Sequence, residues 1–193
     1  MSPSRGPNRR EQILAEAQRL FAERGFREAT LEDVAVTLGV KRQALYHYFS
    51  SKDEILWELT ERAGALIKEA TDSIFERDIP PADKLAALVE AHVRLVLTDA
   101  DLFRVQFEEM GRLPGERGEA LRRQQNDYVQ RVASVIREGQ GDDSFVGDQA
   151  TSQALLIIGM CNWTLAWFDE RRSTVEAVSA LAARSAVGGV LNR

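Results

Sequence analysis

Apolar residues recur along most of the chain at the spacing of an α-helix. The first such stripe lies between residues 8 and 25, and its members are Ile13, Leu14, Ala17, Leu20 and Phe21. Similar stripes follow as far as residue 191, separated by loops expected at residues 111–118 and 139–148. No stretch alternates apolar and polar residues with a period of two, so a sheet is not expected. The pattern predicts an all-α protein of about nine helices.

Two short helices near the N-terminus are predicted to form a helix-turn-helix over residues 31–49. Thr30 followed by Asp33 is a variant of the capping box that begins the first of them. Gly39 suits the turn because glycine adopts a positive φ without steric cost. Ser51 followed by Glu54 repeats the capping signature and predicts the start of a long helix.

The segment "KRQALYHYF", residues 41–49, is predicted to be the second helix of this motif. In a helix-turn-helix, that helix enters the major groove and presents its N-terminal residues to the bases. Gln43 can pair with adenine and Arg42 with guanine through two hydrogen bonds each. An ordinary solvated surface pair is the alternative for Lys41 and Arg42.

Four ring side chains, those of residues 46–49, follow one another in this segment. Leu45 and Phe49 are four residues apart and supply its buried stripe, which leaves Tyr46, His47 and Tyr48 outside it. Their polar tips would then contact phosphate oxygens, which set the register of a protein on DNA. The alternative for the tyrosines is that they are core aromatics. Lys52 falls in the first turn of the next helix, where an anion is also favoured.

Charge is distributed unevenly along the 193 residues. The net charge is −5, yet residues 1–52 carry nine Lys/Arg against six Asp/Glu, which leaves −8 for residues 53–193. A basic head on an acidic body can bind a polyanion at one end while the rest stays dissolved. A DNA-binding protein without a ligand would instead be expected to have a basic body.

The residue types argue against an enzyme and against a metal site. The chain has two histidines and one cysteine, and no Walker loop, GxGxxG or HExxH motif is present. Cys161 and His92 could in principle form a nucleophile and base, but no orienting motif accompanies them. A buried, inert thiol is therefore expected at Cys161, and no metal or cofactor is expected.

The location expected from the sequence is the cytoplasm. The N-terminus lacks the apolar run of a secretion signal, and a single cysteine fits a reducing compartment. Residues 149–168 contain no charged residue, but their several polar side chains favour a buried helix over a membrane span.

The N-terminal residues resemble the TetR family of bacterial transcriptional regulators. The resemblance covers residues 9–59 and rests on "LFAERGF", "ATLEDVAVTLGV" and "LYHYFSSKDEIL". It implies a DNA-binding domain over residues 1–50 and a helical domain over residues 51–193 that binds an effector and forms a dimer. It also implies no enzymatic activity. Carried over by position, the DNA-binding residues are Thr30, Arg42, Gln43, Ala44, Tyr46, His47, Tyr48 and Lys52. The helix-turn-helix geometry described above adds Lys41 to them. Ala44 stands where a hydroxyl residue is frequent, so it offers at most a methyl contact to thymine.

Two final helices are expected over residues 148–170 and 173–191. The first is apolar nearly all round and should be covered on more than one side, and the second offers small residues for close packing. These features agree with a homodimer, which would place two reading helices ~34–36 Å apart on a near-palindromic operator. The alternative is that both helices are ordinary core of a monomer.

A second resemblance concerns "GMCNWTLAWF", residues 159–168. The segment is similar to one in TetR-type regulators of lipid or aromatic-acid degradation that respond to acyl-CoA thioesters. It implies a repressor released by a small hydrophobic effector, with a drug or another hydrophobic metabolite as the alternative. The implied effector residues are Arg94, Phe103, Arg104, Phe107, Met110, Tyr128, Asn162, Trp163 and Trp167. Trp163 and Trp167 could equally be plain core.

Overall fold

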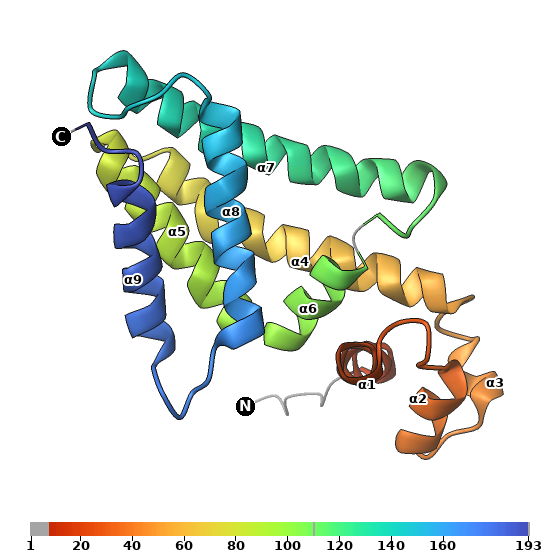
Figure 1. The fold of residues 1–193 in the computed structure, drawn as a ribbon. Coiled ribbons are helices and arrows are strands. Elements are labelled where there is room, and N and C mark those ends of the chain that lie inside the picture. The colour runs from red at the N-terminus through yellow and green to blue at the C-terminus, as the bar shows by residue number, and fades with distance from the viewer. Residues whose placement is uncertain (1–7, 110, 193) are drawn as a thin grey trace, which may run out of the picture. The chain divides into compact units, whose positions relative to one another are not determined.

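The computed structural model describes residues 8–109 and 111–192, and this part of the chain contains nine α-helices (Figure 1). They are α1 (Arg9–Arg24), α2 (Leu31–Thr37), α3 (Arg42–Leu45), α4 (Lys52–Phe75), α5 (Pro81–Thr98), α6 (Ala100–Glu108), α7 (Gly115–Gly141), α8 (Ala150–Trp167) and α9 (Val175–Gly188). Within the described residues, β-type pairing is limited to an isolated antiparallel bridge between Phe145 and Leu191. The prediction of an all-α protein with about nine helices is confirmed.

The chain divides into two compact units. The first takes Met1–Ala63 and Asp101–Glu119, and the second takes Gly64–Ala100 and Ala120–Arg193. The unit with the helix-turn-helix therefore extends beyond residue 50, because it includes the start of α4 and most of α6. The functional division at residue 50 remains a prediction.

In the first unit, the apolar stripe predicted for α1 forms the core. Its five members are at most 2% exposed. Asn8 caps the helix by accepting a hydrogen bond from the backbone N–H of Arg10 at 3.0 Å. Gly25 follows the helix with φ of +80°, a conformation that glycine adopts without strain. The ring of Phe26 packs edge-on against Phe21, with centroids 5.1 Å apart. Both ends of α1 are thus stabilised by local contacts.

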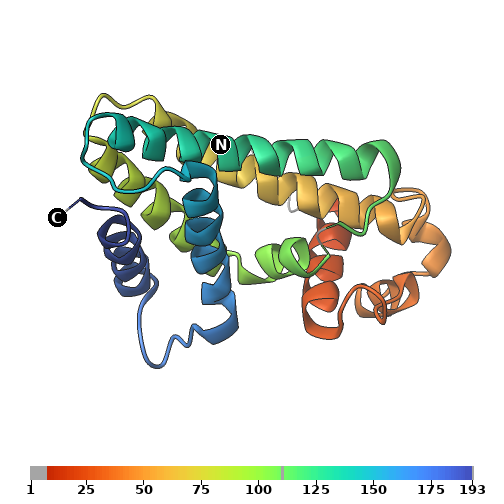
Figure 2. The ribbon, with the colours of Figure 1, turned by 45° about the horizontal axis from the view of Figure 1, so that its top comes forward.

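In the second unit, α5 packs against both α8 and α9, while the second half of α4 lies beside α7 (Figures 1 and 2). Helix α5 begins at Pro81, and Pro80 precedes it with non-helical angles; the fixed φ of proline suits the first position of a helix. The core is aliphatic and draws on every helix of the unit. Its fully buried members include Leu85, Leu88, Val93, Ala133, Ile136, Ala154 and Cys161.

Helix α8 is covered on one side only in the single chain. Its buried residues are Ala150, Ala154, Ile157, Cys161 and Thr164, which form one helical stripe. Leu155, Leu156, Trp163 and Trp167 lie exposed elsewhere on the helix. The expectation of cover on more than one side is therefore not met within one chain. No helix among the described residues is both long and apolar enough to cross a membrane.

Candidate DNA interface and effector core

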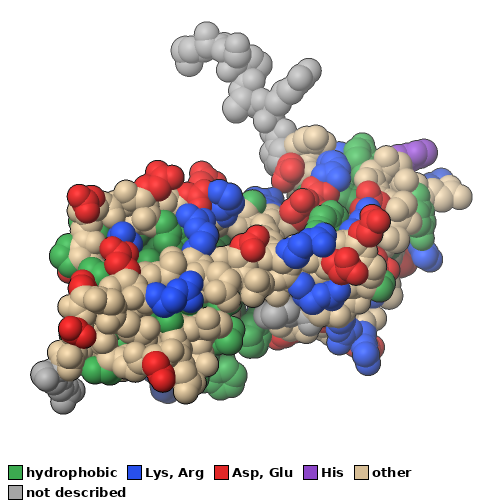
Figure 3. Space-filling model, turned by 90° about the horizontal axis from the view of Figure 1, so that it is seen from above, with side chains coloured by type: hydrophobic (Ala, Val, Ile, Leu, Met, Phe, Trp, Pro, Cys, Tyr) green, Lys and Arg blue, Asp and Glu red, His purple; other side chains and the backbone are tan. Residues whose placement is uncertain are grey.

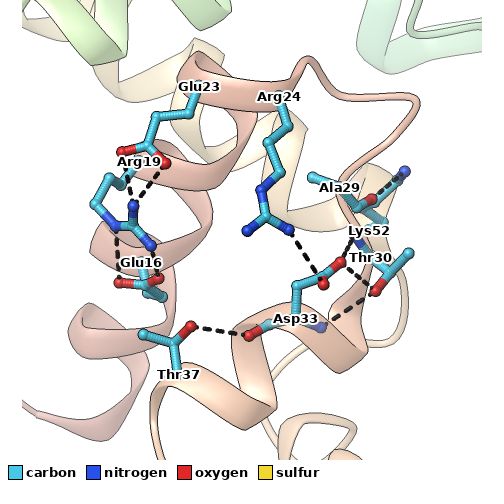
Figure 4. Close-up of polar contacts among 9 residues, drawn as sticks. All are labelled: Glu16, Arg19, Glu23, Arg24, Ala29, Thr30, Asp33, Thr37 and Lys52. Carbon is cyan, nitrogen blue, oxygen red and sulfur yellow. Dashed lines mark hydrogen bonds and ion pairs between the residues drawn. The ribbon is translucent and has the colours of Figure 1, made fainter.

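The capping box predicted at Thr30 is present and ties α2 to its neighbours (Figure 4). Thr30 Oγ1 accepts a hydrogen bond from the Asp33 backbone N–H at 3.1 Å, and Asp33 Oδ2 accepts one from the Thr30 backbone N–H at 2.8 Å. Asp33 Oδ2 also accepts a hydrogen bond from the Thr30 hydroxyl at 2.6 Å, and the two bonds from Thr30 to this carboxylate, assisted by Arg24 at 3.3 Å, lower the pKa of Asp33. A charged Asp33 thus fixes the start of α2.

The turn between α2 and α3 depends on Gly39. Its φ is +65°, which confirms the prediction that glycine supplies a left-handed residue there. The Val40 backbone N–H donates to the Ala35 carbonyl at 3.0 Å and closes the turn. Ala35 is fully buried, as expected of a small residue where two helices approach closely.

Helix α3 is shorter than predicted. It spans Arg42–Leu45, and residues 46–48 form turns instead of continuing it to residue 49. The Tyr48 backbone N–H donates to the Leu45 carbonyl three residues back, at 2.9 Å. Such bonds tighten the end of a helix, and Tyr, His and Tyr are weaker helix formers than Ala or Leu. We call residues 41–49 the reading segment. It consists of one helical turn, α3, followed by a compact turn.

The side chains of this segment point as the sequence predicts. Leu45 and Phe49 are each 1% exposed, whereas Tyr46 is 46% and Tyr48 40% exposed. The other exposed residues assigned to DNA are Thr30, Lys41, Arg42, Gln43 and His47. Ala44 is half-buried. The alternative of buried tyrosines is wrong; contact of each side chain with DNA remains a prediction.

Several cations of the basic head are already paired within the first unit. Arg19 lies 2.6 Å from Glu16 and 2.7 Å from Glu23 (Figure 4). Arg10 forms an ion pair with Glu58 and stacks 4.6 Å from the centroid of the Phe49 ring. On the face drawn in Figure 3, basic and acidic side chains are interspersed. The count of nine Lys/Arg therefore overstates the number of free cations that the head offers to a polyanion.

Lys52 has partners that the sequence did not reveal. Its ammonium donates to the Phe26 carbonyl and, at 2.8 Å, to the Ala29 carbonyl (Figure 4). It also lies 4.3 Å from the centroid of the Phe26 ring. Lys52 thus ties the α1–α2 loop to the first turn of α4, and a phosphate contact by Lys52 remains a prediction.

The capping signature at the start of α4 is present in a modified form. Ser51 Oγ accepts from the Glu54 backbone N–H at 3.1 Å, as expected. Glu54 Oε2 returns to the backbone N–H of Ser50 at 2.6 Å rather than to that of Ser51. Hydrogen bonds from Ser50 lower the pKa of Glu54. The end of the reading segment and the start of α4 are therefore joined by one carboxylate.

In the second unit, α5, α7 and α8 bring together three neutral polar side chains. His92 Nδ1 lies 3.0 Å from the Tyr128 hydroxyl, and His92 Nε2 lies 3.0 Å from Asn162 Oδ1. Because an amide oxygen only accepts, this arrangement implies hydrogen on Nε2 and a Tyr128 O–H that donates to Nδ1. We call these three residues the His92 cluster.

Burial keeps the His92 cluster uncharged. It lowers the pKa of His92 from 6.5 to about 4, although the bond to Asn162 opposes the shift. Burial also raises the pKa of Tyr128. Tyr128 and Asn162 were predicted from the sequence, whereas His92 was considered only as a possible base. Its position among apolar residues of α5 was the signal that it would be buried.

The other predicted effector residues are divided between the two units. Phe103, Arg104 and Phe107 belong to the first unit, where Phe103 is buried and the other two are exposed. Arg94 belongs to the second unit, is exposed and lies 3.8 Å from Glu176. Met110 lies outside the described residues.

Trp163 and Trp167 are exposed residues of α8 in the single chain, 62% and 51% respectively. The alternative that they are core of the monomer is therefore wrong. Their predicted role near the effector is not tested by this arrangement.

Cys161 is buried and free, and burial raises its pKa to about 12. A thiol of that kind is a poor nucleophile at neutral pH, in keeping with the inert role predicted for it. Among the described residues, no group of three or more His, Cys, Asp or Glu side chains could hold a metal ion.

A capped helix-turn-helix with an exposed reading segment, joined to a larger helical unit, defines a class of DNA-binding regulators. Residues 13–59 match the family described as bacterial regulatory proteins, tetR family, and residues 78–190 match the tetracyclin repressor-like C-terminal domain. The chain belongs to the TetR family. It is a DNA-binding transcriptional regulator and not an enzyme, as the sequence predicted.

The individual relatives share only low sequence identity with this chain. The transcriptional repressor KstR2 of Mycolicibacterium smegmatis is 22% identical over 171 residues, which cover 86% of this chain and 82% of that protein. The structure of the ketosteroid transcriptional regulator KstR2 of Mycobacterium tuberculosis matches with a TM-score of 0.89 at 21% identity, over all of both chains. The structure of AibR in complex with isovaleryl coenzyme A and operator DNA matches with a TM-score of 0.84 at 20% identity, over 95% of this chain and 98% of that one. These similarities establish a shared fold.

Proposed function

We propose that the protein is a dimeric repressor that leaves its operator when a small hydrophobic effector binds the second unit. The observation that carries the proposal is the exposed apolar surface of α8 and α9. Its members, which we call the apolar face, are Leu155, Leu156, Trp163, Trp167 and Leu181. A single reading segment makes few contacts with DNA, and a twofold pair doubles them on a near-palindromic site.

The apolar face has the composition of a contact surface between proteins. Leu156 is 75% exposed, and the two tryptophans lie seven and eleven residues further along the same helix. Tryptophan is enriched among the residues that contribute most to such interfaces. Large contiguous apolar patches are uncommon on monomeric proteins. A second copy of the chain is the partner we propose.

The dimer is tested by measuring molecular mass in solution with Leu156→Glu and Trp163→Glu. Each places a charge in the apolar face, and we expect a monomer at concentrations where the unchanged protein is a dimer. Val36→Glu is the matched control, because Val36 is an equally exposed apolar residue on α2. Dimers of unchanged stability in both test variants would refute the proposal.

For the effector, we propose that the His92 cluster contacts its polar group. The cluster offers an imidazole, a phenol and an amide, all uncharged, within an aliphatic core. Such groups can hydrogen-bond a carbonyl or a hydroxyl of the ligand. A carboxylate would be disfavoured, because the cluster contains no cation to pair with its buried charge. An acyl-CoA thioester supplies a carbonyl of this kind at the head of an apolar chain. The complex of AibR with isovaleryl coenzyme A gives this ligand class a precedent in the same fold.

The effector class is tested by thermal unfolding in the presence of acyl-CoAs of graded chain length, with free CoA as the control ligand. A ligand at 100 times its Kd stabilises the folded state by about 2.7 kcal/mol. For a chain of this size, that corresponds to a rise in Tm of roughly 5–10 °C. Tyr128→Phe removes only the hydroxyl and should reduce the rise. No response across the panel would refute the acyl-CoA proposal and leave a drug or another hydrophobic metabolite as the effector.

Release from DNA is proposed to follow from a change in the distance between the two reading segments of the dimer. The effector must favour the released spacing by a few kcal/mol to shift the equilibrium. Spin labels at exposed position 36 would report this distance with and without effector. Release of DNA at an unchanged distance would refute this mechanism.

A further inference from the structure

Arg42 and Tyr46 form a pair on the exposed surface of the reading segment. Arg42 Nη2 donates to the Tyr46 hydroxyl at 2.9 Å, and the guanidinium carbon lies 5.7 Å from the centroid of the ring. Tyr46 follows α3 with helical backbone angles, φ −66° and ψ −13°. The two side chains are therefore one helical turn apart and face the same way.

Arg42 has a neutral side-chain partner, as Arg9 has in Gln12, whereas several other cations of the first unit bond to carboxylates or to backbone carbonyls. Arg10, Arg19 and Arg24 are paired with carboxylates, and Lys52 with backbone carbonyls. Among the interactions of the described residues, Arg42 is bonded to a neutral phenol and to no carboxylate. A phenol holds the guanidinium in place without cancelling its charge, and one hydrogen bond leaves other N–H donors available.

An arginine held in this way binds a base with a smaller loss of entropy. Immobilising a long, flexible side chain reduces affinity by roughly 2- to 10-fold. A bidentate arginine–guanine contact discriminates against the wrong base by roughly 5- to 150-fold. Positioning therefore contributes a measurable part of that discrimination.

We infer that Tyr46 is a positioning residue for Arg42, and that the pair together sets the preference for guanine at one base pair of each half-site. The inference rests on the reading segment entering the major groove. It gives Tyr46 a role in sequence preference, in addition to the phosphate contact predicted from its exposure. A tyrosine hydroxyl that accepts from Arg42 can still donate its own hydrogen to a phosphate.

The two roles of Tyr46 differ in their effects on binding. Loss of a phosphate contact weakens binding to every sequence about equally and reduces the dependence of affinity on salt concentration. Loss of positioning weakens discrimination at one base pair and leaves the other positions unchanged. The effect of losing the positioning also requires Arg42, because without this arginine the phenol has nothing to position.

The experiment uses the full chain and a randomised duplex DNA library, from which the unchanged protein selects its preferred site. Affinities are then measured for that site and for duplexes with each G·C pair replaced by A·T. The variants are Arg42→Ala, Tyr46→Phe and the double variant. Tyr48→Phe is the matched control, because it removes the same hydroxyl from a neighbouring exposed tyrosine.

We expect Arg42→Ala to abolish discrimination at one G·C pair per half-site, and Tyr46→Phe to reduce it at the same pair by roughly 2- to 10-fold. In the Arg42→Ala background, Tyr46→Phe should have no further effect on that pair, and Tyr48→Phe should leave all base preferences unchanged. A uniform loss of affinity with Tyr46→Phe, an unchanged preference, or an equal effect in both backgrounds would overturn the inference. If the unchanged protein selected no DNA site, the proposal that the protein recognises an operator would be refuted. That outcome is distinct from failure of the inference about Tyr46, which requires the comparison of variants.

Discussion

The buried imidazole of His92 should make the stability of the protein depend on pH between about 4 and 6.5. Its pKa is lowered to about 4 in the folded protein, whereas 6.5 is the ordinary value expected after unfolding. Between these values the unfolded chain binds more protons than the folded one. The free energy of unfolding therefore falls as pH falls through this range, and the contribution of His92 is fully present only above pH 6.5.

The size of the effect follows from the difference between the two pKa values. One pKa unit corresponds to about 1.4 kcal/mol, so the shift of His92 from 6.5 to about 4 corresponds to about 3 kcal/mol, lost below pH 4. At pH 5 the same relation gives a loss of about 2 kcal/mol. His92 is fully buried, so solvent screening does not reduce these figures substantially. Tyr128 and Cys161 are neutral throughout this range, and burial moves their pKa values further above it.

The assay is urea unfolding at pH values between about 7 and 5 for the unchanged protein and His92→Gln, at one fixed protein concentration because a dimer unfolds with dissociation. Half-buried carboxylates with lowered pKa values, such as Asp33 and Asp72, also make the protein less stable on acidification. Their contribution is common to both proteins and cancels in the difference. His47→Gln is the matched control, because His47 is exposed.

We expect His92→Gln to be less stable at pH 7 and to lose about 2 kcal/mol less than the unchanged protein on going to pH 5. His47→Gln should follow the unchanged protein. Equal pH dependence in the His92 variant and the unchanged protein would refute the reasoning, since the histidine would then not be buried and neutral. A shallower profile only in the His47 variant would refute it too.

Three further substitutions test contacts within the individual units. Lys52→Met keeps the side-chain stem but removes the bonds to the Phe26 and Ala29 carbonyls, and urea unfolding should show a loss of roughly 2 kcal/mol. Gly139→Ala would place a methyl group 2.4 Å from Cδ2 of buried Phe145, so thermal unfolding should show a loss of about 1–3 kcal/mol. Thr30→Ala removes the cap of α2 and should lower stability by about 1 kcal/mol, whereas Thr30→Ser should not.

The helices and their caps could be predicted because their signals are local. Thr30 with Asp33, Gly39 and Pro81 each act within a few residues of the chain. The length of α3 was overestimated for a related reason. Apolar spacing continues through residues 45–49, although α3 ends at Leu45 and residues 46–48 form turns in which Tyr46 keeps helical angles. The Ser50–Glu54 contact follows these turns. Periodicity reports which side chains are buried, and the backbone hydrogen bonds decide where a helix ends.

Contacts between distant residues explain what the sequence could not reveal. Lys52 was predicted to meet an anion because it stands at a helix start, yet its observed partners are carbonyls more than twenty residues earlier. His92 bonds to residues 36 and 70 positions away. The resemblance predicts Tyr128 and Asn162 as effector residues, but it does not link them to His92. The packing of three helices brings the three side chains together.

The proposed effector site and the proposed dimer surface share helix α8. Asn162 bonds to His92, and the next residue, Trp163, lies on the exposed side of the same helix. A ligand that takes the Asn162 bond must therefore act on the helix that carries the apolar face. The two proposals are coupled physically: Asn162→Ala should change both the stabilisation by effector and the dissociation constant of the dimer. If Asn162→Ala changed only the stabilisation by effector, α8 would not transmit effector binding to the dimer surface. The distance between the reading segments would then be set by other parts of the protein.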